Sequence, residues 1–193
     1  EMKVGLMQSA NEYERAFESW LGDNGIKYVY VDQSRRNLFG REKLKTFDFL
    51  LYPAVERGPV IIAEIKGKLF KGDSLAGLKG MQNWVGTEDV RGMMQWQQRL
   101  GSTGRFDHTR AVFIFVYKFA NIDVENDGNE IYDFDGNSYA FFCVELKNYI
   151  ENMKLRSSGW HTVSLPSNDF RKQAFPLREL LAPDTIKPYR VCY

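Results

Sequence analysis

The sequence predicts an α/β protein in which helices flank a mixed central sheet. Helical and strand-like segments alternate along the 193 residues, and this alternation is typical of the α/β class. Two continuous apolar runs, at 60–63 and 111–117, indicate strands that are covered on both faces. Hydrophobic side chains make up 44 % of the chain and aromatic side chains 15 %, which is enough for a sizeable core. The length favours a single domain, residues 1–193.

The first half of the chain is expected to begin with a helix over residues 9–22, capped by Ser9 or Asn11. One face of that helix carries apolar side chains at helical spacing: Tyr13, Ala16, Phe17, Trp20 and Leu21. The elements expected after it are strands at 26–31, 47–52 and 59–65, a glycine-rich loop at 69–86, a helix at 88–100 and a strand at 111–117.

The second half is expected to contain shorter elements. Asp135-Gly136-Asn137 lies between two strand-like segments at 131–134 and 139–144, which is typical of a hairpin. The remaining elements expected are a helix at 147–155, a short strand at 160–164 and a C-terminal helix at 170–181.

Charge and cysteine content limit the classes of function. The chain carries 26 basic and 25 acidic side chains, so any surface for nucleic acid must be local. Residues 33–79 hold ten basic and five acidic side chains, which indicates an anionic partner or a solvated basic surface. Two cysteines exclude a disulfide framework and, because no signal segment opens the chain, predict a cytoplasmic protein. No apolar run is long enough to span a bilayer, so no membrane partner is expected.

The most informative pattern joins an acid in one expected strand to an acid and a lysine in the next. If the strands at 47–52 and 59–65 pair as a hairpin, Asp48 lies across from Glu64. Glu64 and Lys66 share one face of their strand because alternate residues point to the same side. Two carboxylates and an ammonium group are therefore expected to converge at one point.

Such a site favours a hard cation. Two neighbouring carboxylates repel each other when both are charged, and oxygen ligands suit Mg²⁺ or Mn²⁺. The metal can lower the pKa of a bound water and stabilise charge on a phosphate oxygen. Lys66 can orient the attacking water or stabilise the transition state. The pattern therefore predicts phosphodiester hydrolysis, with Asp48, Glu64 and Lys66 as the catalytic residues.

The same residues resemble the PD-(D/E)XK nuclease superfamily. Asp48 stands at the motif Asp, and Glu64-Ile65-Lys66 stands at the (D/E)XK tripeptide. The resemblance implies a restriction-endonuclease-like αβββαβ core over about residues 9–117, with a C-terminal elaboration over about 118–193. It also implies further metal ligands, namely a carboxylate from the first helix and the backbone carbonyl of the tripeptide's middle residue. In this sequence these are Glu14 and Ile65.

A narrower resemblance concerns the first helix. Residues 12–18 (EYERAFE) resemble the signature of HYExAFE, a little-characterised bacterial family found mainly in planctomycetes. Glu12 stands where that signature has His, and the proline that often precedes the motif Asp48 is absent. The HYExAFE resemblance implies a nuclease-like fold and no established reaction.

The wider resemblance implies a Mg²⁺-dependent nuclease, with DNA favoured over RNA. The basic side chains expected to hold phosphates, without regard to base sequence, are Arg35, Arg36, Lys68 and Lys71. A catalytically inert module that binds nucleic acid or a protein is the alternative, favoured by the acidic segment 121–135. A metal-dependent phosphohydrolase acting on a small nucleotide is a third hypothesis, and a homodimer stays open.

A second Glu-X-Lys tripeptide, Glu145-Leu146-Lys147, follows the segment 139–144. The acids upstream of it lie in the expected hairpin turn, and the tripeptide itself is expected to begin a helix. We therefore place the site at Asp48 and Glu64.

Overall fold

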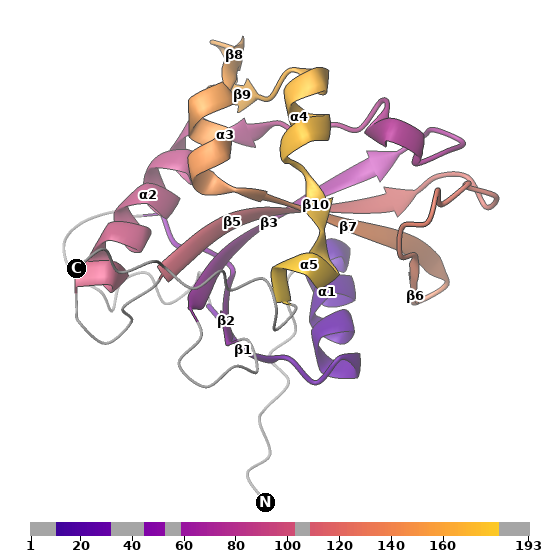
Figure 1. Cartoon of the computed structure of the whole chain (residues 1–193), viewed down its shortest axis with the longest axis horizontal. Coiled ribbons are helices and arrows are strands. Elements are labelled where there is room, and N and C mark those ends of the chain that lie inside the picture. Colours follow the sequence, from indigo (N-terminus) through magenta and orange to yellow (C-terminus); the bar gives the residue numbers. More distant parts are fainter. Residues whose placement is uncertain (1–10, 32–44, 53–58, 103–108, 182–193) are drawn as a thin grey trace, which may run out of the picture.

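The computed structural model describes residues 11–31, 45–52, 59–102 and 109–181, which form a mixed α/β structure around a curled sheet (Figure 1). The described helices are α1 (Glu12–Asp23), α2 (Thr87–Ser102), α3 (Leu146–Asn152), α4 (Ser167–Gln173), α5 (Leu177–Leu181) and the 3₁₀ turn η2 (Ala76–Leu78). The strands are β1 (Lys27–Tyr30), β2 (Phe49–Tyr52), β3 (Val60–Phe70), β4 (Val85–Gly86), β5 (Thr109–Phe119), β6 (Tyr132–Phe134), β7 (Asn137–Glu145), β8 (Lys154–Ser157), β9 (Thr162–Ser164) and β10 (Phe175–Pro176).

The main sheet has the strand order β1-β2-β3-β5-β7-β10, and β6 pairs with β7. Its long central strands β3 and β5 run parallel over eleven residue pairs, and the other strand pairs are antiparallel. A parallel pair needs a crossover connection, and the segment that contains α2 supplies it. A smaller three-stranded sheet has the order β4-β9-β8. The α/β class with a mixed sheet is therefore confirmed.

Helices cover both faces of the main sheet, with α1 and α5 on one side and α2, α3 and α4 on the other (Figure 1). Alternate residues of β3 separate into these two layers, since Ile61 packs in the core with Phe17 of α1 and Ile62 packs in the core with Met93 of α2. The apolar run at 111–117 is buried throughout, as the sequence predicts. No helix in these described segments is long and apolar enough to cross a membrane.

Helix α1 begins after Asn11, whose side-chain oxygen accepts hydrogen bonds from the backbone N–H groups of Tyr13 and Glu14, each at 3.0 Å. Asn11 is thus the cap, because it satisfies two donors that the first turn leaves unpaired. The predicted apolar face packs on the sheet, where Phe17 meets Phe49 edge to face at 5.1 Å between ring centroids. This packing fixes which side of α1 faces β2 and β3.

Two expectations for the C-terminal half are wrong. The helix predicted at 170–181 is interrupted, because Phe175 and Pro176 pair with β7 as β10. Proline has no N–H to donate and clashes with a preceding helical turn, so α4 ends before it and α5 begins after it. The helix predicted at 147–155 ends at Asn152, and the residues that follow form β8, which the sequence pattern does not reveal.

Two glycine-to-alanine substitutions are expected to change stability in opposite directions. A Cβ added at Gly67 on β3 would lie 2.3 Å from the Tyr13 ring, so Gly67→Ala should lower the free energy of unfolding by about 1–3 kcal/mol. A Cβ at Gly101 in α2 meets nothing within 4 Å, so Gly101→Ala should raise it by about 0.5–1 kcal/mol. Urea denaturation of both variants checks the signs, and an unchanged midpoint for Gly67→Ala would contradict the predicted clash.

Candidate active site

Asp48 and Glu64 lie side by side where β2 begins against β3. Phe49 pairs with Ala63, which sets Asp48 opposite Glu64, and the predicted antiparallel pairing of these segments is confirmed. The Asp48 N–H donates to the Ala63 carbonyl at 3.1 Å, and its Oδ2 accepts from the Ile65 N–H at 2.7 Å. The side chains are buried, with residue exposures of 4 % for Asp48 and 3 % for Glu64.

The backbone of Ile65 turns toward Asp48. The N–H and C=O of one strand residue point to the same side of the strand, and the Ile65 N–H is bonded to Asp48. The Ile65 carbonyl therefore also faces the Asp48 side of β3, beyond the last described pair between β2 and β3. This is the direction that the predicted role of Ile65 requires.

Lys66 lies on the same face of β3 as Glu64. Its Nζ donates to Glu64 Oε1 at 2.8 Å and lies 2.6 Å from Oδ2 of Asp89 on α2. The side chain is 16 % exposed, so one ammonium group joins two buried carboxylates at the rim of the core. The expected meeting of Asp48, Glu64 and Lys66 is present.

The surroundings of Glu64 disfavour the charged form of its carboxyl group. Burial is the main cause that raises the pKa of its carboxyl to about 7; the Lys66 ammonium opposes this rise, and the charge of Asp48 contributes to it. Its Oε2 is buried and has no hydrogen-bond partner among the described residues. A buried carboxylate oxygen without a partner is costly, and a bound cation or a proton would remove that cost.

Glu14 is the carboxylate of α1 that faces this site. Its residue exposure is 9 %, and Oε2 accepts from the Tyr30 hydroxyl at 3.3 Å while Oε1 accepts from Asn11. Burial raises the pKa of Glu14, and the charge of Asp48 adds to the rise. Glu18, one turn later, instead accepts from the Tyr28 hydroxyl. The Asp48 charge thus acts on the Glu14 carboxyl. The role of Glu14 as a metal ligand stays a prediction.

Sequence reasoning missed two members of this cluster, Asp89 and Lys45. Asp89 is 5 % exposed, its Oδ2 accepts from the Gly86 N–H at 3.0 Å, and its Oδ1 pairs with Lys45 Nζ. Asp89 therefore closes the first turn of α2 as the acid of a capping box does and also neutralises Lys66. The only sequence signal for Asp89 is the acidic pair Glu88-Asp89 at the start of α2, and such a pair indicates a helix cap and not a functional site.

The predicted phosphate contacts have different surroundings. Arg35 and Arg36 lie outside the described residues. Lys71 is exposed just after β3. Lys68 is only 4 % exposed, and its Nζ donates to the Trp84 carbonyl at 2.9 Å. A phosphate could meet Lys68 only if Trp84 moved, so this placement favours a structural role for Lys68.

The donor set suits a hard cation in part. Asp48 and Glu64 offer carboxylate oxygens, and Glu64 Oε2 lacks a partner in the described part of the chain. Within the described ranges, however, no group of three or more His, Cys, Asp or Glu side chains is arranged to hold a metal ion. Mg²⁺ is often bound through one or two carboxylates, with waters and phosphate completing the shell. Asp48, Glu64 and the Ile65 carbonyl therefore fit Mg²⁺, whereas both Glu14 oxygens already accept hydrogen bonds, from Asn11 and Tyr30.

Replacing Glu64 with glutamine is expected to change how stability depends on pH. The folded protein holds the Glu64 proton up to a pKa of about 7, above the ordinary 4.5, so Glu64 lowers wild-type stability as pH rises from about 4.5 to 7. Glu64→Gln has no such loss, and its stability relative to wild type should grow by about 2 kcal/mol between pH 5 and pH 8. Urea denaturation in EDTA at both pH values measures this difference; parallel pH profiles would contradict it.

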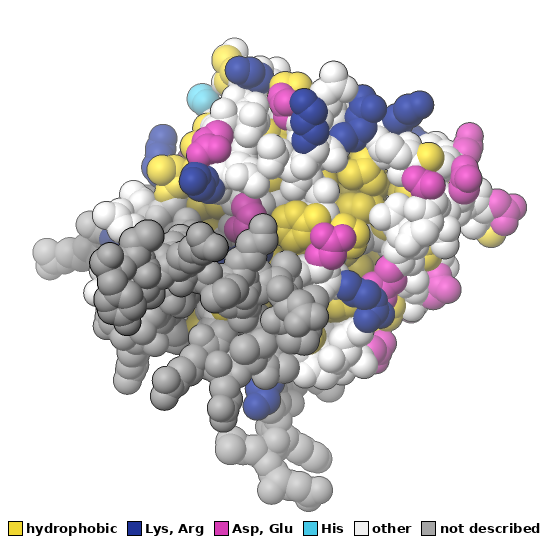
Figure 2. Space-filling model, viewed as in Figure 1, with side chains coloured by type: hydrophobic (Ala, Val, Ile, Leu, Met, Phe, Trp, Pro, Cys, Tyr) yellow, Lys and Arg dark blue, Asp and Glu magenta, His cyan; other side chains and the backbone are white. Residues whose placement is uncertain are grey.

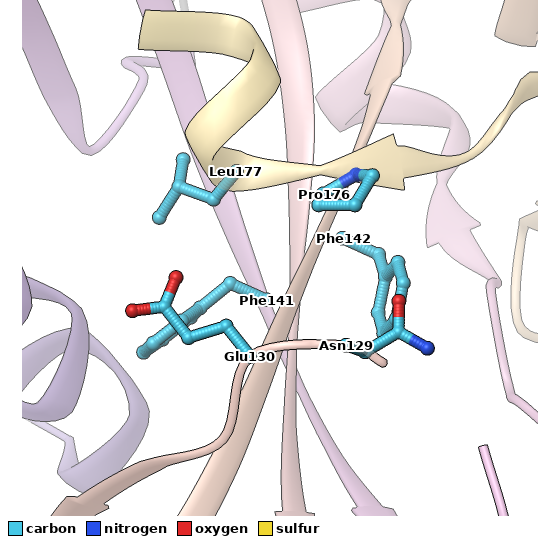
Figure 3. Close-up of a pocket in the computed structure, with 6 residues that line it drawn as sticks. All are labelled: Asn129, Glu130, Phe141, Phe142, Pro176 and Leu177. Carbon is cyan, nitrogen blue, oxygen red and sulfur yellow. The ribbon is translucent and has the colours of Figure 1, made fainter. Parts of the chain in front are cut away.

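A separate hollow lies between β7, β10 and the segment before β6 (Figure 3). Its lining residues are Asn129, Glu130, Phe141, Phe142, Pro176 and Leu177. The enclosed space is about 10 Å³, enough for a single water molecule. The Glu130 carboxylate accepts two hydrogen bonds from the Arg178 guanidinium, with N···O distances of 2.6 and 2.7 Å. The hollow includes none of the site residues and is too small for a substrate molecule.

Comparison with protein-family models and with curated proteins finds no match for this chain. The PD-(D/E)XK and HYExAFE resemblances therefore stay hypotheses.

Proposed function

We propose that the chain is a Mg²⁺-dependent nuclease, able to use Mn²⁺, that hydrolyses phosphodiester bonds in nucleic acid, with DNA favoured over RNA. The observation that carries the proposal is the buried pair of Asp48 and Glu64 with Lys66 on the same strand face. Buried carboxylates beside a lysine mark a functional-site candidate, because burial and charge disturb their protonation.

The fold supports the same proposal. The described elements α1, β1, β2, β3, α2 and β5 follow one another as αβββαβ, apart from the short η2 and β4 between β3 and α2. The resemblance to the PD-(D/E)XK superfamily implies this order and places its acids on the second and third strands. Here Asp48 directly precedes β2, and Glu64 lies on β3. A fold alone does not fix a function, so the site residues are the main support for the proposed nuclease activity.

Each residue has a chemical task in this proposal. Asp48, Glu64 and the Ile65 carbonyl would hold the metal, with Glu14 as a further ligand. Mg²⁺ supplies an acidified water and charge balance at the phosphate oxygen when it is bound. The ammonium of Lys66 would orient the attacking water and stabilise the negative charge on the oxygens around phosphorus in the transition state. The oxygen of water would bond to phosphorus and release a proton to solvent, the bond to the leaving oxygen would break, and that oxygen would take up a proton from solvent.

One observation favours the inert alternative. Lys66 forms ion pairs with both Glu64 and Asp89, and Asp89 also binds Lys45. Buried groups that neutralise one another in this way also occur as purely structural networks. In that case the protein would be a nuclease-like module that binds nucleic acid or a protein without cleaving it.

Calorimetric titration with Mn²⁺ and Mg²⁺ distinguishes the metal-dependent nuclease from the inert module. Wild type is expected to bind metal, and Asp48→Asn, which keeps the size of the side chain, is expected to lose that binding. Asp133→Asn is the matched control, because Asp133 is an exposed acid on β6.

A cleavage screen completes the test, with single- and double-stranded DNA, RNA and mononucleotides as substrates. Cutting of polymers in Mg²⁺, abolished by EDTA and by Asp48→Asn, would support the nuclease. Hydrolysis of mononucleotides alone would instead assign a small-molecule phosphohydrolase. Wild type that neither binds metal nor cuts would overturn the proposal in favour of the inert module.

A further inference from the structure

The hairpin formed by β8 and β9 presents an exposed aromatic side chain. Trp160, in the turn between the two strands, is 84 % exposed, and Leu155 on β8 is 69 % exposed. Both residues belong to one short hairpin, and exposed apolar side chains rimmed by polar residues mark interaction sites. The packing of the core does not account for Trp160, because it belongs to neither core cluster of the described residues.

The hairpin is firmly anchored although its tip is exposed. The Tyr149 hydroxyl, on α3, donates to the Val163 carbonyl at 3.1 Å and to the Asn83 carbonyl at 2.8 Å. The Leu165 N–H donates to the Asn83 side-chain oxygen at 2.9 Å. Within the turn, the Trp160 N–H donates to Ser157 Oγ at 3.2 Å. A backbone held on such a support loses little conformational freedom when it binds a partner.

The charge around Trp160 is positive. Residues 152–168 contain Lys154, Arg156 and His161 and no Asp or Glu, and both Lys154 and Arg156 are exposed. Figure 2 shows several dark-blue side chains along the upper edge of the molecule, where Figure 1 places β8, β9 and α4, whereas many acidic side chains gather at the right. A cationic surface with an exposed aromatic ring suits an anionic, aromatic ligand.

A direct chain of contacts joins the hairpin to the candidate active site. Gly86 of β4 pairs with Thr162 of β9, and the Thr87 N–H donates to the His161 carbonyl at 2.9 Å. Asp89 lies two residues further along α2. Its Oδ2 accepts from the Gly86 N–H and lies 2.6 Å from Lys66 Nζ. The hairpin is thus fixed to the helix end that also holds Lys66.

Basic side chains also lie along this path. Lys66 and Lys68 share a face of β3, and Lys68 Nζ lies 3.1 Å from the centroid of the Trp84 ring. Arg156 of the hairpin lies over the same ring at 5.2 Å. Basic side chains are therefore spaced from Lys66, past Lys68 and Trp84, to Arg156, and Arg156 is the exposed one.

We infer that the β8–β9 hairpin binds single-stranded nucleic acid next to the scissile site, with Trp160 stacking on an unpaired base and Lys154 and Arg156 contacting phosphates. This inference rests on the proposed function, since it names how that site holds its substrate. An exposed indole stacks on the face of any base, whereas in a duplex the base faces are covered by their neighbours. A single strand of nucleic acid therefore fits both the exposed indole ring and the basic side chains beside it.

The test is binding of fluorescein-labelled oligo-dT of 15 nucleotides, followed by fluorescence anisotropy in EDTA so that cleavage cannot occur. Trp160→Ala is expected to raise the Kd roughly 5- to 100-fold, and Trp160→Phe should keep most of the affinity. Arg156→Gln should lower the slope of log Kd against log salt by about 0.7, the contribution of one phosphate contact on a single strand. Binding should also quench tryptophan fluorescence in wild type and less so in Trp160→Phe.

Matched controls are Ile122→Ala, which removes an apolar side chain that is 98 % exposed, and Lys27→Gln, which removes an exposed charge on β1. Neither should alter binding. Wild type that does not bind oligo-dT, or Trp160→Ala that binds as wild type does, would overturn the inference. A dimer that light scattering detects in wild type and not in Trp160→Ala, without an effect on oligo-dT, would also overturn it by assigning Trp160 to self-association.

Failure of this inference is distinguishable from failure of the proposed function. Cleavage that survives in Trp160→Ala with unchanged oligo-dT affinity would leave the nuclease standing and remove the hairpin from it. Oligo-dT binding that depends on Trp160, in a wild-type protein that cuts nothing, would keep the hairpin surface and favour the inert nucleic-acid-binding module.

Discussion

Replacing Lys66 with methionine is expected to lower the rate of Mg²⁺-dependent cleavage about 10²- to 10³-fold, which is the usual effect of removing one preorganised donor from a charged transition state. Methionine keeps the apolar stem of the side chain and removes the ammonium group that contacts Glu64 and Asp89. Single-turnover cleavage under saturating metal measures the chemical step directly.

The protein should stay folded without the Lys66 charge. Glu64 can keep its proton, because burial raises the pKa of its carboxyl to about 7, and Asp89 retains its ion pair with Lys45. Lys27→Met is the matched control, since Lys27 is exposed on the edge strand β1. Cleavage by Lys66→Met at the wild-type rate, with a normal thermal midpoint, would remove Lys66 from the chemistry and leave it a structural ion-pair partner.

Replacing Phe115 with alanine is expected to cost about 3–5 kcal/mol of stability. Phe115 lies at the middle of β5 with no exposed surface, and its ring meets Phe170 of α4 edge to face at 5.6 Å. It also stacks near Tyr117 and Tyr149 at 6.4 Å each. The cavity left by truncation borders both α3 and α4, so a domain with typical stability of about 5–15 kcal/mol would lose a large share of it.

Thermal and urea denaturation measure this loss, and a fall in the melting temperature of roughly 10 °C is expected for a chain of this size. Ile122→Ala is a suitable comparison, because Ile122 is 98 % exposed and should shift the midpoint very little. A loss below about 1 kcal/mol in Phe115→Ala would mean that α4 does not pack on β5 as the structure describes.

The local sequence pattern predicted most of the elements that carry the site. The apolar runs at 60–63 and 111–117 indicated buried central strands, and their burial is confirmed. The spacing between Asp48 and Glu64 predicted that the two acids lie opposite each other, and the register confirms it. These predictions succeeded because strand alternation and hairpin pairing depend on residues that are near in sequence.

The C-terminal half was harder to predict for a physical reason. β8 and β10 are short, and their burial patterns do not alternate in a way that separates them from loops. They are strands because β9 and β7 supply the hydrogen-bond partners. Pairing across the fold overrides local propensity in such segments, so a periodicity search cannot find them.

The sequence by itself determined the α/β class, the central strands and the convergence of Asp48, Glu64 and Lys66. Only the tertiary structure decided what surrounds those groups. It brought Asp89 from the first turn of α2 onto Lys66, buried Lys68 under Trp84 and attached the β8–β9 hairpin to the start of α2. Each of these contacts joins residues that lie between sixteen and more than seventy positions apart. Contacts over such separations depend on how helices and sheets pack, which local spacing does not encode.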